Sequence, residues 1–568
     1  MRGKIKDKLM SFISIFAMLL AMCFIISVPQ GHAALSFTEQ TDADFNINEN
    51  VLDATLGDLD NDGLNDVIAL TESGGTYRIR IWENTSSAGT ATFNASNVVY
   101  STASRVLNKV IVANLNSATN ANTQNDIIAC ANYDSVTANQ QIMVWKNPGK
   151  AAGTVFAASW NGGSPNAMFG GSTSHISDIA AGELDGDSGN NYVDLVSANG
   201  ASAIIRQNPS DSAADPYTGG NWTTSGELTG SKTNVTTVAI GHIDGTNDTF
   251  KDVAIGYNNG SAAALIAYQN PAASIYTGNW TTSATIAALA GTATTRITGI
   301  VIANRNGPEV TDPNDCDIFW TRGDSAVSSQ EKSLKVKTNP GGTTPFAGVW
   351  GTTTIETQTS TNGYYFNEVA LGDFTPDSNK YPDVVYAVDS NGDTEPITKG
   401  EEGNTYANTF TPSLAAVSGK TVATGFIDEA VSGNGKIDFI AGFTTDGGAE
   451  QEIRVWRNDA GTTAATLKPK SFKAEPKAKK IVLRWVTSSE VDSASFTVLR
   501  SEDGGTTYDV TVGSVNANGE SPSGAKYNLT DSNVERGKIY YYKLQEIDLS
   551  TSTTDLATLK VKYKKAKK

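Results

Sequence analysis

The sequence predicts an all-β protein in which a seven-bladed β-propeller is followed by a small β-sandwich. Three observations lead to this fold class. One acidic motif recurs seven times between residues 56 and 442, each copy is flanked by short strands rich in Val, Ile, Thr and aromatic residues, and the C-terminal part alternates apolar and polar side chains. After residue 33 the chain has no long stretch with the period of a helix.

The chain begins with a segment that has the order of a secretory signal. Basic MRGKIKDK comes first, the apolar run LMSFISIFAMLLAMCFIISV follows, and PQGHA precedes ALSF. This order predicts a signal peptide over residues 1–33, cleaved after Ala33, and therefore a secreted, extracellular or cell-surface protein. An uncleaved anchor is the alternative, because the apolar run is long enough to span a bilayer. No second such segment follows, so we expect no membrane span after cleavage.

The formal net charge of -17 is distributed unevenly along the chain. Residues 466–568 carry 18 Lys and Arg against 12 Asp and Glu, whereas residues 34–465 carry 21 against 47. So acidic a body repels nucleic acid and attracts divalent cations. After residue 33 the only histidines are His175 and His242, which argues against a Ser-His-Asp triad and against a His-rich zinc site.

The repeated motif is clearest in LGDLDNDGLNDVIAL, residues 56–70. Weaker copies are AGELDGDSGNNYVDLVSA at 181–198, IGHIDGTNDTFKDVAIG at 240–256 and LGDFTPDSNKYPDVVYA at 371–387, and fainter ones lie at 112–129, 302–320 and 424–442. Each copy ends on an aspartate that opens an apolar strand. These closing aspartates are Asp66, Asp126, Asp194, Asp252, Asp317, Asp383 and Asp438.

Two further landmarks keep the same spacing. In six copies a short apolar strand ends near an asparagine, as in RIRIWEN and EIRVWRND. In four copies an aromatic residue lies in a later polar strand, namely Phe93, Trp222, Trp280 and Trp350. Each repeat therefore reads as four strands, and a radial β-propeller over residues 34–465 is the arrangement we predict. The seventh repeat lacks a fourth strand, which we expect the N-terminal segment ALSFTEQTD to supply, closing the ring.

The loops resemble the FG-GAP/VCBS repeats of integrin-α-type β-propellers over about residues 35–462. In that family the loop joins the first two strands of a blade and binds calcium. The resemblance implies that Asp58, Asp60, Asp62 and Asp66 are side-chain ligands and that Leu64 offers a carbonyl oxygen. Calcium takes about six to eight hard oxygen ligands, and alternate residues of a tight loop can direct them at one centre. An EF-hand does not fit, because the closing residue is Asp66 and a strand follows it.

The same alignment gives graded calcium candidates in three other repeats. The third repeat keeps four carboxylates, the sixth keeps three carboxylates and a hydroxyl, and the fourth keeps three aspartates but begins with His242. The candidate ligands are Glu183, Asp185, Asp187, Asp194, Asp373, Thr375, Asp377, Asp383, Asp244, Asp248 and Asp252. Crowded carboxylates repel one another, so a cation among them is expected to stabilise the loops.

Two other interpretations of these residue types stay open. A pair of carboxylates can serve as the acid and base of a glycosidase, although here the acids occupy like positions of repeated units. Trp82, Trp145 and Trp456 could stack on sugars, as in a lectin, but their equivalent strand positions favour packing between adjacent blades.

The composition turns basic and proline-punctuated at LKPKSFKAEPKAKK, which marks a linker and a new domain over residues 466–562. Its alternating strands suit a β-sandwich and are similar to a fibronectin type III module. We expect its core to contain Leu483, Trp485, Phe496, Val498, Tyr540, Tyr542 and Leu544. Residues 563–568 form a basic tail that either pairs with an acidic surface or is a solvated end.

The sequence favours a calcium-stabilised binding or adhesion protein whose partner is an extracellular protein or glycan, not nucleic acid. We find no catalytic constellation, and a fold of this kind permits many functions. Two alternatives therefore stay open. One is a carbohydrate-active enzyme, a lyase or hydrolase on a propeller scaffold, and the other is a structural surface-layer or matrix protein that associates with itself.

Overall fold

The structure is a computed structural model of the whole chain. It describes residues 37–40, 45–86, 91–116, 124–132, 141–149, 154–157, 159–170, 175–185, 192–200, 202–212, 214–223, 225–228, 234–244, 250–260, 262–272, 275–276, 280, 282–290, 294–304, 316–324, 332–340, 345–358, 364–372, 374, 382–390, 396–402, 405–410, 417–427, 437–445, 452–458, 466–467, 471–477, 479–489, 493–517, 525–548 and 553–563. The predicted signal peptide, residues 1–33, and all but the first residue of the basic tail lie outside these residues.

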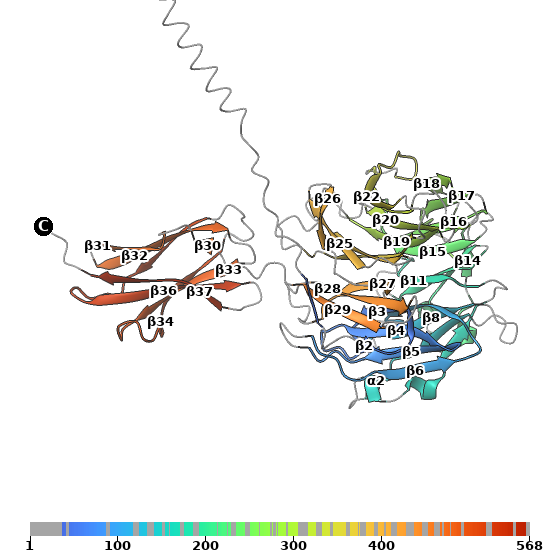
Figure 1. The fold of residues 1–568 in the computed structure, drawn as a ribbon, viewed down its shortest axis with the longest axis horizontal. Coiled ribbons are helices and arrows are strands. Elements are labelled where there is room, and N and C mark those ends of the chain that lie inside the picture. The colour runs from blue at the N-terminus through green and yellow to red at the C-terminus, as the bar shows by residue number, and fades with distance from the viewer. Residues whose placement is uncertain are drawn as a thin grey trace, which may run out of the picture. The chain divides into compact units, whose positions relative to one another are not determined.

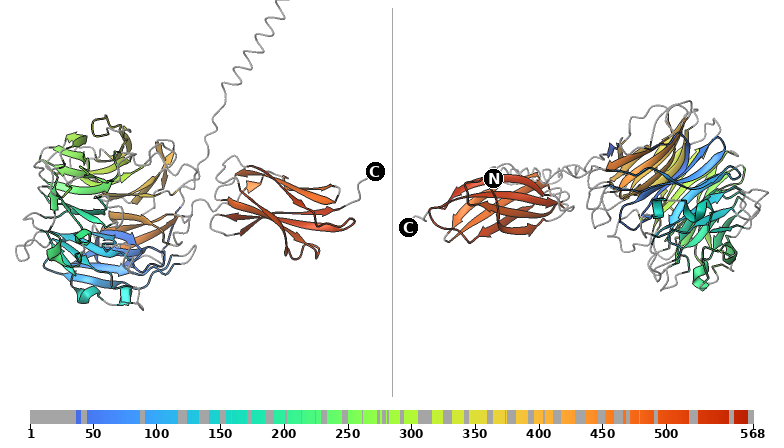
Figure 2. Two further views of the ribbon diagram at one scale, coloured as in Figure 1. Left: turned by 180° about the vertical axis from the view of Figure 1, so that it is seen from behind. Right: turned by 90° about the horizontal axis from the view of Figure 1, so that it is seen from below.

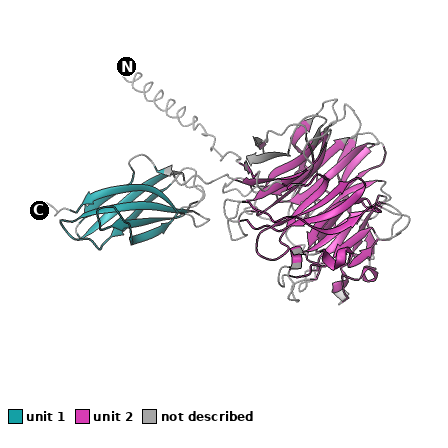
Figure 3. Cartoon of the chain, turned by 60° about the horizontal axis from the view of Figure 1, so that its bottom comes forward, with its two compact units in different colours: residues 1–33, 463–568 teal, residues 34–462 magenta. Residues whose placement is uncertain are grey.

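The chain divides into two compact units (Figure 3). Unit 2 comprises residues 34–462, and unit 1 comprises residues 463–568 together with residues 1–33. In the described part of the chain, no helix has the length and apolar character needed to cross a lipid bilayer.

Unit 2 consists of short antiparallel strands (Figure 1). The first sheet contains β3 (Asn50–Gly57), β4 (Asp66–Ser73), β5 (Thr76–Trp82) and β6 (Asn97–Thr102). The second contains β7 (Leu107–Ala113), β8 (Asp126–Ala131), β9 (Ile142–Trp145) and β10 (Ala167–Phe169). The third contains β11 (Asp178–Gly182), β12 (Asp194–Ala198), β13 (Ala203–Arg206) and β14 (Ser225–Glu227). The fourth contains β15 (Val235–Gly241), β16 (Asp252–Asn258), β17 (Ala262–Tyr268) and β18 (Ser283–Ala290).

The next sheet has eight strands and consists of two four-stranded groups linked by one residue pair, Gly323 and Tyr365. Its first group contains β19 (Thr295–Ala303), β20 (Asp317–Asp324), β21 (Lys332–Lys337) and β22 (Thr353–Gln358). Its second group contains β23 (Tyr364–Gly372), β24 (Asp383–Ser390), β25 (Pro396–Glu402) and β26 (Thr405–Phe410). The last sheet contains β27 (Val417–Gly425), β28 (Asp438–Thr445), β29 (Glu452–Asn458), β1 (Phe37–Glu39) and β2 (Phe45–Asn46).

Each sequence repeat thus corresponds to one group of strands, called the first to seventh repeat below. The prediction of an all-β, repetitive chain is confirmed. Helical turns among the described residues are short and lie in connections; they are α2 (Thr154–Ala157), η1 (Trp160–Gly163), η2 (Pro209–Ser212) and η3 (Gly219–Asn221). The second strand of a repeat is buried almost throughout, as in β4 and β8, and this is why it reads as a continuous apolar run.

The N-terminal strand β1 pairs with the last repeat. Phe37 lies opposite Asn458 and Glu39 opposite Trp456 in antiparallel register. The Phe37 ring lies 5.0 Å from that of Phe439, edge to face. An ion pair of 3.1 Å between Arg454 and Glu39 also joins the two strands. The beginning of the described chain therefore occupies the outer position of the seventh repeat.

The first strands of successive repeats lie against one another. β3 contacts β7, and contacts of the same kind follow between β7 and β11, β11 and β15, β15 and β19, β19 and β23, and β23 and β27, while β27 contacts β3. Six of these strands carry a register shift near their start, for example between Val51 and Asp53 in β3. Residues around these irregularities line a polar cavity of about 360 Å³ to which all these strands contribute. Figure 2 gives two further views of the strands of unit 2.

Charged residues cross this cavity. Lys109 of β7 forms an ion pair of 3.0 Å with Asp53 of β3 and a second ion pair with Glu368 of β23. The Thr421 hydroxyl of β27 donates to Glu368 at 2.6 Å. Burial raises the pKa of Asp53 to about 7, even though Lys109 attracts its charged form. Burial also disfavours the charged form of Lys109, but attraction to Asp53 and Glu368 outweighs it and keeps that pKa well above its ordinary value.

Unit 1 contains two four-stranded sheets. One is formed by β30 (Thr466–Leu467), β31 (Lys473–Lys477), β32 (Lys480–Ser489) and β35 (Lys526–Asp531), and the other by β33 (Ser493–Ser501), β34 (Val510–Asn516), β36 (Ile539–Asp548) and β37 (Thr553–Lys562). Both sheets contribute to one apolar core, which contains all seven residues predicted for it. A buried ion pair of 2.8 Å between Arg500 and Asp531, with Tyr542 donating to Asp531, also links the sheets.

We predict that Lys109→Met lowers the free energy of unfolding of unit 2 by about 3 kcal/mol at pH 8, because it leaves two carboxylates without their counter-ion. The loss should be smaller at pH 5. Removal of Lys109 raises the pKa of Asp53 further, because Lys109 favours the charged form. Asp53 is therefore neutral at pH 5, and an unpaired buried charge destabilises the variant only at higher pH.

Urea unfolding followed by tryptophan fluorescence at both pH values measures this loss. Lys526→Met, which changes an exposed lysine of unit 1, is the control. Equal losses in the two variants would contradict a specific role for the Lys109 ion pairs.

Candidate functional site

The acidic loop of the first repeat joins β3 to β4 and is compact because its backbone is tightly turned. Leu59 anchors it in the core with no exposed surface. Asn61 and Gly63 adopt positive φ angles of 61° and 93°, which glycine and asparagine tolerate best. The Asp58 carboxylate accepts backbone N–H groups of Asn61 at 2.6 Å and Gly63 at 3.0 Å. The loop therefore turns around one of its own carboxylates.

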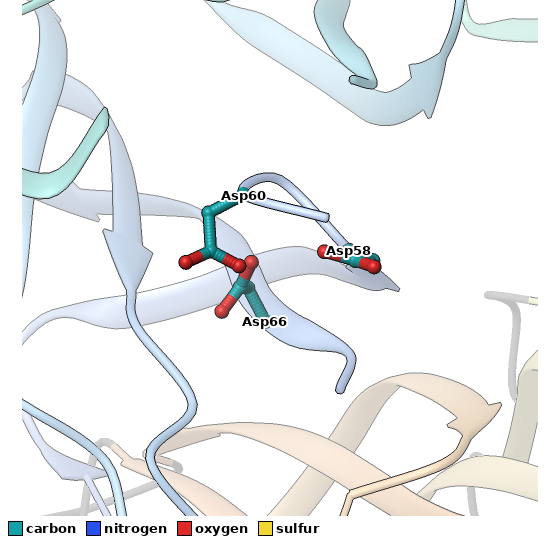
Figure 4. Close-up of side chains that lie close together, drawn as sticks. All are labelled: Asp58, Asp60 and Asp66. Carbon is teal, nitrogen blue, oxygen red and sulfur yellow. The ribbon is translucent and has the colours of Figure 1, made fainter. Parts of the chain in front are cut away.

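Three carboxylates of this loop come together. Asp58, Asp60 and Asp66 each place one oxygen within 4.8 Å of the others, so the group could hold a metal ion. Figure 4 shows Asp60 and Asp66 close to each other with Asp58 to one side. Asp66 is buried and the other two are half-buried. All donors are oxygens, the ligand type that hard divalent cations prefer.

Asp62, which is also expected at this site, is not part of that group. The exposed Asp62 carboxylate accepts the backbone N–H of Leu64 at 2.8 Å. This short-range hydrogen bond makes Asp62 part of the turn, and the structure does not bring it to the three clustered oxygens.

The third repeat contains a second group of this kind. Glu183, Asp185 and Asp194 place one oxygen each within 4.8 Å of one another. Asp185 Oδ2 accepts hydrogen bonds from Tyr276 at 3.2 Å and Gln207 at 3.4 Å. Asp185 Oδ1 is buried and has no hydrogen-bond partner in the described part of the chain. A buried oxygen in this state is costly unless a cation or donor reaches it.

The remaining predicted ligands are only partly placed. In the fourth repeat Asp244 accepts from Gln269 at 2.6 Å and Asp252 from the backbone of Ile243 at 2.9 Å. In the sixth repeat Asp383 accepts the Phe374 N–H at 2.8 Å. Other predicted ligands lie outside the described residues; they are Asp187, Asp248, Asp373, Thr375 and Asp377. Among described residues, groups of three acids occur only in the first and third repeats.

In five repeats the closing aspartate accepts two backbone hydrogen bonds that do not involve any ion. Asp66 Oδ2 accepts the backbone N–H of Leu59, and Asp66 Oδ1 accepts that of Asn84, both at 2.8 Å. The same two bonds recur at Asp126, Asp194, Asp252 and Asp438. One carboxylate therefore joins the loop before the second strand to the end of the third strand.

The asparagine at the end of the third strand links neighbouring repeats. Asn147 Nδ2 donates to the carbonyl of Asn125 in its own repeat at 2.9 Å and to that of Leu59 in the preceding repeat at 2.8 Å. The second type of bond recurs for Asn84, Asn208, Asn270, Asn339 and Asn458. The sequence shows these asparagines as a landmark, but their partners lie in other repeats and cannot be read from spacing.

Tyrosines from the following repeat donate hydrogen bonds to two of the closing aspartates. Tyr217 donates to Asp126 Oδ2 at 2.8 Å, and Tyr276 donates to Asp194 Oδ2 at 2.7 Å. Sequence reasoning missed both residues. Their signal is weak, because tyrosine and phenylalanine alternate at this place in the PYTGGNW, IYTGNW and PFAGVW segments.

Burial is the largest influence on the pKa of three closing aspartates. It raises the pKa of Asp66 to about 8, and the charges of Asp60 and Asp58 add to this effect while backbone hydrogen bonds oppose it. Burial likewise raises the pKa of Asp194 to about 7 and that of Asp126 to about 6. A cation beside Asp66 or Asp194 favours the charged form and would reverse the shift.

The tryptophans that suggested sugar stacking are in the core. Trp82, Trp145 and Trp456 expose at most 3% of their surface. Trp145 belongs to an apolar cluster that also contains residues of the first repeat, such as Ile79 and Val99. Packing between repeats therefore accounts for them, and their faces are not available to a ligand.

Comparison with known proteins gives little information about the function of these residues. No protein-family model matches the chain, and no curated protein matches it. Among solved structures, the chain is similar to a β-1,2-glucanase from Parabacteroides distasonis at 13% identity, over 47% of this chain and 35% of that one, with a TM-score of 0.14. A score this low carries no argument about fold or activity.

We predict that Asn147→Ala lowers the free energy of unfolding by about 2–4 kcal/mol. The buried carbonyl of Leu59 and the partly buried carbonyl of Asn125 lose their donor, and a fully buried unsatisfied group costs about 1–3 kcal/mol. Urea unfolding measures the change. Asn516→Ala, at an exposed asparagine of unit 1, should change stability by less than about 0.5 kcal/mol. A loss for Asn147→Ala no larger than that would contradict the role of this side chain.

We also predict that cation binding at the first repeat releases a proton from Asp66. With a pKa of about 8, the cation-free carboxyl is largely protonated at pH 7, and a bound cation requires its charged form. The affinity for calcium should therefore fall by up to about tenfold per pH unit below pH 8 and level off above it.

Calorimetric titrations with calcium in buffers of different ionisation enthalpy measure this proton release. Asp66→Asn is the control, since it cannot release the proton. A calcium affinity at the first repeat that is constant from pH 6 to pH 9 would contradict the prediction.

Proposed function

We propose that this chain is an exported, calcium-stabilised binding or adhesion protein that presents a seven-bladed propeller of the FG-GAP/VCBS kind to an extracellular protein or glycan. The observation that carries the proposal is the recurrence of one carboxylate cluster at equivalent places in two repeats. Asp58, Asp60 and Asp66 form it in the first repeat, and Glu183, Asp185 and Asp194 form it in the third. Such recurrence is typical of a scaffold device rather than of a single catalytic centre.

The succession of contacts between the first strands of the repeats supports the propeller. The first strands touch in sequence from β3 to β27, and β27 touches β3 again. The cavity of about 360 Å³ draws its lining from every one of them, as expected for strands arranged around a common axis. The bond from Asn84 to the carbonyl of Ile427 connects the first repeat to the seventh, and β1 pairs with β29.

The choice of calcium rests on the donors. Both clusters offer carboxylate oxygens and no nitrogen or sulfur, and carboxylates on a compact loop suit calcium better than softer metals. Without a cation, three acids within 4.8 Å of one another repel, and burial adds to the cost. A calcium ion would offset both effects and fix the loops at one edge of the sheets.

The hydrogen bonds that the carboxylates already accept favour a binding role over catalysis. The closing aspartates accept two backbone N–H groups each, so they have a structural task in every repeat where both bonds are seen. Unit 1, with two sheets around one core, supports a β-sandwich similar to a fibronectin type III module, which would act as a spacer or docking surface.

We predict that calcium removal by EDTA lowers the melting temperature of unit 2 and that added calcium restores it. Stabilisation by a ligand grows with its concentration relative to Kd, and about 100 Kd of calcium should contribute about 2.7 kcal/mol per site. Differential scanning calorimetry of the full chain measures the shift. A melting temperature that is the same with calcium and with EDTA would contradict the proposal.

Single substitutions should distinguish the calcium response of the first-repeat cluster from that of the third-repeat cluster. Asp60→Asn should remove most of the calcium response of the first repeat, and Asp185→Asn that of the third, because each deletes one charged ligand. Asp509→Asn, at an exposed aspartate of unit 1, is the matched control and should leave the calcium titration unchanged.

A further inference from the structure

A cavity lies between the second and third repeats, beside the second-repeat position that corresponds to the acidic clusters of the first and third repeats. The cavity measures about 400 Å³ and is lined by Asn116, Lys146, Tyr192, Ser210, Asp215 and Tyr217, among others. Its walls come from Asn116 after β7, Lys146 after β9, Tyr192 two positions before β12 and the connection between β13 and β14. The volume lies at the lower end of the range of about 300–1,000 Å³ that holds small-molecule ligands.

Amides and a lysine replace acids in this repeat. Asn116 occupies the position that Asp60 has in the first repeat and Asp185 in the third. Lys146 directly precedes Asn147, as Gln207 directly precedes Asn208 in the third repeat. The second repeat therefore loses charged metal ligands and gains a fixed positive charge.

Lys146 supplies a positive charge close enough to the closing aspartate, Asp126, to favour its charged form. The Lys146 ammonium lies 4.6 Å from the centre of the Tyr217 ring, and the Tyr217 hydroxyl donates to Asp126 at 2.8 Å. Burial raises the pKa of Asp126, while the hydrogen bonds of Asn147, Tyr217 and Leu115 and the charge of Lys146 lower it.

One polar group in the cavity has its hydrogen-bonding capacity unused. The Asn116 side-chain oxygen is buried and has no hydrogen-bond partner in the described part of the chain, and the residue as a whole is 9% exposed. A buried acceptor in this state costs about 1–3 kcal/mol. A ligand that donates a hydrogen bond to Asn116 would recover this energy, so the oxygen marks a place where a donor is expected.

The other lining groups restrict the chemistry of that ligand. Lys146 and Asp215 bring opposite charges, so the cavity as a whole favours a neutral molecule. Tyr192 and Ser210 offer hydroxyls that both donate and accept, and the Tyr192 ring offers an apolar surface. A molecule whose hydroxyl groups donate to Asn116 and Asp215 and accept from Lys146, and whose C–H groups lie against a ring, meets all these conditions.

We propose that the cavity between the second and third repeats binds a neutral sugar ring without the help of calcium. This deepens the proposed binding function, because it names one site and one ligand class for it. The acidic clusters would stabilise the scaffold, and the residues that line this cavity would bind the ligand.

The test uses the full chain in EDTA, with glucose, galactose, mannose and N-acetylglucosamine as probes. Saturation-transfer NMR and calorimetric titration should detect saturable binding of at least one sugar. Asn116→Ala should weaken that binding by at least about tenfold, because it removes the acceptor for a ligand hydroxyl. Asn516→Ala in unit 1 is the matched control and should bind as the parent does.

A second variant protects the test against misfolding. Should Asn116→Ala lose its cooperative unfolding transition, Tyr192→Ala, which changes a half-buried side chain, decides instead and should also weaken binding about tenfold. The absence of saturable binding for all four sugars, or binding that survives in the folded variants, would overturn the proposal.

The outcome is distinguishable from that of the calcium proposal. Sugar binding in EDTA by a chain whose melting temperature ignores calcium would support the site and refute the calcium clip. A chain that calcium stabilises but that binds none of the sugars would refute the site alone.

Discussion

The structure of unit 2 depends on a buried aspartate that holds two backbone N–H groups at once. At Asp66 these belong to Leu59 and Asn84, and the amide of Asn84 in turn bonds to the carbonyl of Ile427 in another repeat. A buried carboxylate is stable only when its oxygens are satisfied. The sheet edge, the acidic loop and the neighbouring repeat are therefore held by one connected set of hydrogen bonds.

Burial of so many carboxylates is unfavourable, and the groups that offset it differ between repeats. In the first and third repeats the closing aspartate lies among further acids, an arrangement that invites a cation. In the second repeat those acids are absent, and the charge of Lys146 favours the charged form of Asp126. Sequence divergence among the repeats thus follows one electrostatic constraint and need not reflect loss of structure. The same constraint lets a repeat lose its acids without losing its place in the fold.

Much of the fold could be predicted from the sequence, because strand period, turn residues and motif spacing are local signals. The closing aspartates, the strand-rich repeats and the seven core residues of unit 1 follow from such patterns. The partners of the asparagines could not be predicted, since Asn147 bonds to Leu59 across 88 residues. Nor could the position of Asp62, whose exposed carboxylate accepts a hydrogen bond within its own turn. The loop spacing that makes Asp62 a ligand candidate suits a turn equally well.

The pairing of β1 with β29 has a consequence for how the chain acquires its structure. Glu39 and Arg454 meet across 415 residues of sequence, so the outer strand of the seventh repeat is synthesised first and finds its partner last. Closing so long a loop is entropically slow. During synthesis β1 stays unpaired until nearly the whole of unit 2 has left the ribosome. In that interval chaperone binding and aggregation compete with its pairing to β29.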